Sequence, residues 1–264
     1  MMRFGSSSNF AINRLRRDAE SSQVENVATR KGVAIKTVYF SALAIASAVL
    51  TYMFIVYRIM MPLIESGADV SGQMGLLSVL LIVAIVLTLV CAIACMFSIK
   101  AVPIMGSLYA VSQGFLLGVI STFAEIAYPG VVFSALLATT AVFAVMSVLY
   151  YSGIVKVTDR FRAFMMVALI SAVVCNLLMF VLSLIIPALR NTFYGSGLLS
   201  IGISVIMVAI ASLMLLIDFN MIDNIVERGM DKKYEWVGAF SLTVTLIWLY
   251  MEILRLLIKL RGRR

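Results

Sequence analysis

The chain alternates long apolar stretches with short polar ones. Apolar runs close to the length needed to cross a bilayer, about 20 residues, occur seven times, at 37–57, 76–97, 104–124, 131–151, 163–186, 198–217 and 236–258. The runs are continuous rather than alternating, so they predict helices and not the strands of a membrane barrel. All four prolines fall between the runs or at their ends, where helix-breaking residues are expected. We therefore predict an all-α integral membrane protein with seven transmembrane helices.

The polar residues gather at the two ends of the chain. Residues 1–35 are polar and basic and predict a cytoplasmic, mostly disordered arm; 36–260 form the transmembrane domain, and 261–264 form a basic tail. With 62% hydrophobic residues, the net charge of +8 does not indicate nucleic-acid binding, because the basic residues lie in loops and tails. The partner that this composition predicts is the lipid bilayer.

Basic residues are far more frequent in the segments on the amino-terminal side of the membrane than on the other side. The positive-inside rule then places the amino terminus in the cytoplasm. The basic tail conflicts with this orientation, because seven crossings place it outside. Either the early helices dominate the orientation, or the last helix is re-entrant and both ends lie inside; we favour seven crossings because 236–258 is long enough.

The chain contains no histidine. This excludes histidine-based triads, HExxH zinc sites and haem ligation by histidine. Any sensing of pH near neutrality must then use carboxyl groups whose pKa is raised by desolvation. We expect no cofactor and no enzymatic activity; the least favoured alternative is a membrane enzyme that holds a divalent metal on Asp218 and Asp223.

Carboxylates within the apolar runs are the strongest candidates for function, because a charge at membrane depth costs about 2.5–3.5 kcal/mol on insertion scales. Counting along the helices at 1.5 Å per residue places Asp218 roughly 15 Å from the inner end of the sixth helix, with Asp223 nearer the cytoplasm. Glu252 on the last helix lies roughly 10 Å further outward, and Glu125 ends the third run on the same outer side. The acids therefore form a predicted inner layer and a predicted outer layer.

Each acid also has a simpler interpretation. Glu252 can pair with Arg255 and extend toward the lipid headgroups, Asp218 and Asp223 can belong to a solvated inner loop, and Glu125 can be a loop acid. Thr245, Trp248, Glu252, Arg255 and Lys259 follow steps of three and four residues, so they lie along one stripe of the last helix. Gln113 is most simply a helix–helix hydrogen-bonding residue, and Gly114 and Gly118 permit close packing.

Several segments resemble the Bax inhibitor-1 family of transmembrane Bax inhibitor motif proteins. They are LLIDFNMID (215–223), GAFSL…LRLL (238–257) and, as in a bacterial Bax-inhibitor-like branch, 107–132 and 147–161. The resemblance covers about 33–258 and implies seven helices with the last one central and six around it in two layers. It also implies a slow, pH-sensitive calcium leak sensed by an aspartate pair on the last two helices, held by a shared proton or an arginine latch. Asp218 matches the first aspartate, and Thr245 stands where the second is expected.

The leading hypothesis is thus a pH-sensitive cation leak or ion-sensing protein, with calcium as the transported or sensed ion. Calcium prefers six to eight oxygen ligands, which Asp218 with Asp223, or Glu252 with Glu125, can supply in part. Arg58 and Arg255 are the latch candidates, and Thr245 and Gln113 are candidate pore or packing residues. The alternative is a non-conducting regulatory membrane protein that binds protein partners, whose identity the sequence does not reveal. The expected location is a bacterial plasma membrane.

Overall fold

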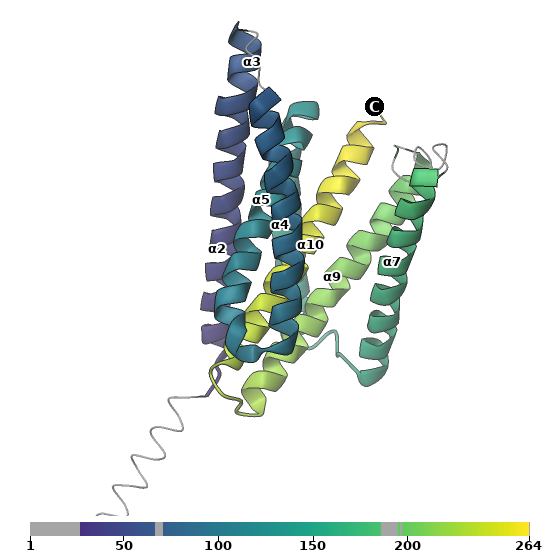
Figure 1. Cartoon of the computed structure of the whole chain (residues 1–264). Coiled ribbons are helices and arrows are strands. Elements are labelled where there is room, and N and C mark those ends of the chain that lie inside the picture. The colour runs from purple at the N-terminus through teal and green to yellow at the C-terminus, as the bar shows by residue number, and fades with distance from the viewer. Residues whose placement is uncertain (1–26, 67–70, 186–194, 196, 264) are drawn as a thin grey trace, which may run out of the picture.

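A computed structural model describes residues 27–66, 71–185, 195 and 197–263, and within these ranges the regular structure is helical (Figure 1). The helices are α2 (Arg30–Ile55), η1 (Val56–Met60), α3 (Met61–Ser66), α4 (Ser71–Phe97), η2 (Ile99–Ala101), α5 (Val102–Ala127), α6 (Val131–Tyr151), α7 (Asp159–Ile185), α9 (Leu198–Glu227) and α10 (Tyr234–Arg261). Seven helical stretches are long and apolar enough to cross a membrane. The predicted all-α fold with seven spans is confirmed.

The first helix begins earlier than the apolar pattern indicates. Thr29 caps α2 by accepting a hydrogen bond from the backbone N–H of Gly32 at 3.0 Å, which is a favourable start for a helix. The helix thus starts six residues before residue 36, where the predicted transmembrane domain begins, because hydropathy detects only the part of a helix at hydrocarbon depth. Most of the arm, 1–26, lies outside the described residues.

The helix passes through Pro62 instead of ending there. Before this proline the backbone forms the π-helical segment η1, which links α2 to α3. Proline cannot donate the backbone hydrogen bond that an α-helix needs at that position, and a π-helical turn accommodates such an interruption. Pro62 is thus an internal irregularity of the first membrane helix.

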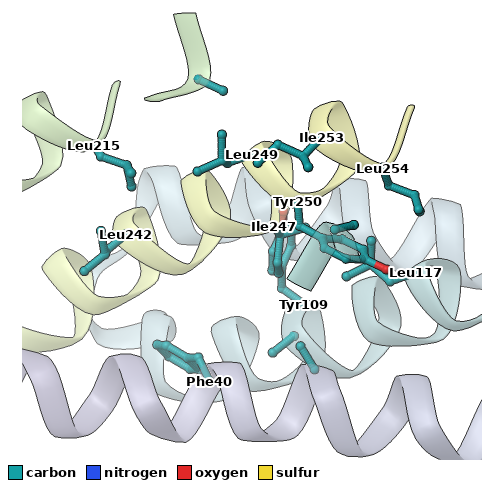
Figure 2. Packing of buried hydrophobic residues seen from close by; sticks show 14 of the residues in the cluster. Phe40, Tyr109, Leu117, Leu215, Leu242, Ile247, Leu249, Tyr250, Ile253 and Leu254 are labelled. Atoms are coloured by element: carbon teal, nitrogen blue, oxygen red, sulfur yellow. The ribbon is translucent and has the colours of Figure 1, made fainter. Parts of the chain in front are cut away.

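The last helix lies in the interior of the bundle. Figure 1 shows α10 between the group formed by α2, α4 and α5 and the pair α9 and α7, and it packs directly on α2, α5, α6 and α9. Its apolar side chains form much of the core: Ile247 and Tyr250 face Tyr109 and Leu117 of α5, while Leu249 and Ile253 point to the opposite side of the helix (Figure 2). The central position expected for the last helix is confirmed.

Two glycines bring α2 and α5 into direct backbone contact. A methyl group on Gly114 would overlap the backbone carbonyl oxygen of Ala44, and one on Gly118 would come within 2.7 Å of the carbonyl oxygen of Ala48. Small residues at such positions are typical of close helix pairs in membranes. The predicted packing role of these glycines is confirmed.

The outer helices α4 and α7 expose most of their apolar side chains. In α7, Phe164, Val167 and Ile170 are each more than half exposed, and Figure 1 shows this helix at the edge of the bundle beside α9. In a bilayer, lipid covers such faces, so their exposure is the ordinary state of a membrane protein.

Candidate functional site

The carboxyl group of Asp218 lies between the last two membrane helices. It is 4% exposed and stands nine residues, or roughly 14 Å, from the end of α9 at Glu227. The hydroxyl of Ser241 on α10 donates to Oδ1 at 2.6 Å. Thr245, one turn further along α10, also approaches this carboxyl group, but among the described residues Oδ2 has no hydrogen bond of ordinary geometry.

No lysine or arginine in the described part of the chain forms an ion pair with Asp218. An ionised carboxylate in such surroundings is costly unless it is paired. Binding a proton or a cation removes this cost, whereas Ser241 alone compensates only one of the two oxygens. The site is therefore suited to exchange a proton or to contact a passing cation.

Asp223 has different neighbours from Asp218. Its Oδ1 accepts from Arg30 Nε of α2 at 2.7 Å, and its Oδ2 accepts from the hydroxyl of Tyr150 of α6 at 2.9 Å. Five residues of helix separate the two aspartates, which turns them about 140° apart. The structure thus does not assemble the expected two-aspartate inner site, and the described residues contain no cluster of three or more potential metal-ligating side chains.

Glu252 lies in the carboxyl-terminal half of α10 and is 3% exposed. The indole N–H of Trp248 donates to its Oε1 at 3.1 Å, and Arg255 Nη1 donates to both carboxylate oxygens at 3.0 Å. The predicted stripe on this helix therefore exists, and so does the Glu252–Arg255 pair. The burial of Glu252 contradicts the simpler interpretation in which it extends to the lipid headgroups.

Glu125 binds the backbone of the turn between α5 and α6. Its carboxylate accepts from the backbone N–H groups of Gly130 at 2.5 Å and Val132 at 3.0 Å, where a negative charge favours the start of a helix. Among the described residues, no hydrogen bond or shared ion-pair partner joins Glu125 to Glu252. The expected outer layer is thus two separate local arrangements.

The remaining candidates are not joined to these acids. Arg58 is exposed in the π-helical segment η1, and it forms no ion pair with any described acid. Gln113 is half-buried on α5 without a hydrogen bond from its side chain within the described ranges. Arg255 therefore has the contact expected of a latch, and Arg58 does not.

The sequence did not predict an ion pair, largely buried, that joins the start of α2 to the start of α10. Glu235 is 1% exposed and pairs with Lys36 of α2, while the backbone N–H and hydroxyl of Thr29 donate to its Oε1 at 2.8 and 3.1 Å. The apolar pattern places Lys36 directly before the first apolar run and Glu235 directly before the last one, where exposure is expected. The available signal was periodicity, because Lys36 stands three residues after the buried Val33 and four before the buried Phe40.

Lys259 is a second missed residue. It is 6% exposed and donates from α10 to the backbone oxygen of Ser200 at 3.2 Å and to the hydroxyl of Ser204 at 2.9 Å, both on α9. Its position on the stripe of Glu252 and Arg255 was the available signal. The stripe thus connects the central helix to the amino-terminal end of α9.

These features define the class of the protein: an all-α integral membrane protein whose last helix is interior and faces a buried carboxyl group on the sixth span. The family model described as Bax inhibitor 1 like matches residues 8–262. The chain belongs to this family, as the resemblance of its last two helices indicates. A search of curated proteins found no match.

Proposed function

We propose that the protein is a pH-sensitive cation leak in which Asp218 is the group that exchanges the proton. The observation that carries this proposal is the geometry of Asp218, which lies deep in the bundle with one oxygen bound to Ser241 and the other without a hydrogen bond from any described residue. Calcium is the proposed cargo. The carboxylate of Asp218 and the hydroxyl of Thr245 are oxygen groups of the kind that calcium prefers.

The four acids on the last two helices that contact other side chains fall into two groups with respect to this function. Asp223, Glu235 and Glu252 each have a cationic partner, so their charge is compensated in the folded protein. Asp218 is the buried acid without one. Membership in the family supports a membrane role of this kind, and it gives no support to the two-aspartate metal enzyme.

The test is calcium flux into proteoliposomes over a range of pH. For a single titrating carboxyl group, the ratio of the protonated to the ionised form changes about tenfold per pH unit. Asparagine resembles the protonated acid, so we expect Asp218→Asn to hold the flux near the level that the unmodified protein reaches at low pH. Its flux should no longer respond to pH.

Two variants serve as controls for this assay. Asp231→Asn lies in the loop between α9 and α10, where the backbone N–H and ammonium group of Lys233 lower the pKa of Asp231, so it stays ionised over the assay range. Glu252→Gln removes a carboxylate that Arg255 already compensates. Both variants should keep the pH dependence of the flux. The proposal fails if Asp218→Asn also keeps the pH dependence, or if the unmodified protein gives no flux. In the second case, a stable co-purifying protein supports the regulatory alternative.

We further propose a bacterial plasma membrane with the amino terminus in the cytoplasm. The support is the concentration of basic residues at the end of the bundle that holds Arg30 and Lys232. In the structure α10 is one unbroken helix of 28 residues, or roughly 42 Å, which supports a full crossing over a re-entrant segment.

Single cysteines at Lys232 and Arg263 test this topology in a variant without the native cysteines. A maleimide that cannot cross the membrane should label Arg263→Cys in intact cells and Lys232→Cys only after the cells are opened. Labelling of both positions from the same side contradicts seven crossings.

A further inference from the structure

A long cavity of about 620 Å³ lies between α2 and α6, with α5 and α10 behind it. This volume falls within the range of about 300–1,000 Å³ that is typical of ligand pockets. Figure 2 shows part of the wall, where Leu117 of α5 lies beside Ile247 and Tyr250 of α10. We refer to this cavity as the α2–α6 groove.

The wall of the groove offers hydrocarbon contacts and few unused hydrogen-bonding groups. The hydroxyls of Thr122, Thr139 and Thr243 donate to backbone oxygens of their own helices at 2.6–2.8 Å, and those of Ser121 and Tyr250 lie 2.7 Å apart. Polar groups that already form hydrogen bonds within the protein do not need a hydrogen-bonding partner on a ligand. The groove therefore suits an apolar occupant.

The dimensions of the groove match one leaflet of a bilayer. Its wall runs from Ser41 to Tyr52 on α2 and from Val132 to Phe143 on α6, which corresponds to roughly 16 Å along each helix. The hydrocarbon core of a bilayer is about 30 Å thick, so the groove extends over about half of it. Ile45 and Phe133 on its rim are 58% and 67% exposed, so the groove opens sideways, toward lipid.

Positive charge stands at the end of the groove near the start of α6. Arg261, in the last turn of α10, donates to the backbone oxygens of Tyr128 and Pro129, directly before the groove residue Val132. Arg263 follows and is exposed. Glu125 at this end directs its carboxylate to backbone N–H groups, and neither arginine forms an ion pair among the described residues.

We propose that the α2–α6 groove binds one acyl chain of an anionic phospholipid, taken from the leaflet at the carboxyl-terminal end of α10, with the phosphate next to Arg261. The apolar wall and its length of one leaflet select the chain, and Arg261, which contacts the turn at the end of the groove, selects the negative headgroup. The proposal does not depend on ion conduction, because none of its residues contacts Asp218.

The test is photo-crosslinking in proteoliposomes that contain phosphatidylglycerol with a diazirine on the acyl chain, followed by mapping of the adducts by mass spectrometry. We expect adducts to concentrate on groove residues of α6 and α10. Thr139→Trp fills the groove from α6 and Ile45→Trp fills it from α2, and each should reduce these adducts about tenfold, equivalent to 1.4 kcal/mol of binding. Leu137→Trp is the matched control, because Leu137 lies on the same helix, is 56% exposed and does not line the groove.

The headgroup is tested by exchanging the probe for phosphatidylcholine with the same chain. The unmodified protein should give fewer groove adducts with phosphatidylcholine, and Arg261→Gln should abolish this difference while leaving the phosphatidylcholine adducts unchanged. Thermal unfolding verifies that each variant is folded. Adducts spread evenly over α4, α7 and the groove in the unmodified protein would overturn the proposal, whatever the variants do, and a preference that survives Arg261→Gln would overturn the role of the arginine.

Discussion

Glu235→Gln is expected to destabilise the folded protein by about 3–5 kcal/mol, the range measured when one partner of a buried ion pair is removed. Glu235 is 1% exposed and compensates Lys36, whose side chain is only 15% exposed. Glutamine keeps the shape of the side chain but leaves the largely buried ammonium group of Lys36 without a counter-charge. The measurement is unfolding in detergent micelles, followed by circular dichroism against temperature and against denaturant.

The matched control is Asp231→Asn in the preceding loop. Asp231 pairs with Lys233 at 3.2 Å, but both side chains are about half exposed, so we expect no measurable change. Adding Lys36→Met to Glu235→Gln should recover part of the lost stability, since the double variant removes the uncompensated charge. Equal stability of Glu235→Gln and Asp231→Asn would show that this ion pair does not hold the start of α2 against the start of α10.

Gly114→Leu is expected to have an effect of similar or larger size, because no rotamer of leucine avoids the backbone of α2. Even a methyl group at this position would overlap the carbonyl oxygen of Ala44. Overpacking of a well-packed core costs about 1–3 kcal/mol and occasionally more, and here the obstacle is backbone that cannot rotate away. We expect a sharp decrease in the yield of folded protein and in its unfolding temperature.

Gly202→Leu provides the comparison for this substitution. Gly202 lies in α9 with open space around it, so leucine adds only apolar surface toward lipid and improves the intrinsic helix propensity. Its unfolding temperature should equal or exceed that of the unmodified protein. If the two variants behave alike, the contact between α2 and α5 is less tight than the structure indicates.

The two proposals depend on different parts of the molecule. The leak depends on one carboxyl group between α9 and α10, and the lipid site depends on an apolar groove between α2 and α6. The pH dependence of flux and the pattern of crosslinks can therefore fail independently.

The sequence by itself determined the number of helices, their approximate limits and the level of each acid along its helix. Helices are predictable here because lipid offers no hydrogen-bonding groups. The backbone N–H and C=O groups of every long apolar run must therefore pair with one another, as they do in a helix. Depth follows because the rise per residue is constant. This is why Asp218 and Glu252 lie at different levels, as expected, and why the family could be identified from the last two helices.

Only the tertiary structure decided which side chains meet. The direction in which a residue points across the bundle depends on how each helix is rotated and which helix crosses it, and neither is set by hydropathy. Asp223 therefore contacts Arg30 instead of joining Asp218, and Glu235 lies buried against Lys36, 199 residues away in the chain. A charged side chain at the end of a helix can be exposed to water at little cost in free energy. The sequence therefore contains no energetic reason to predict that these two residues lie within the bundle. Their burial results from the packing of α2 against α10.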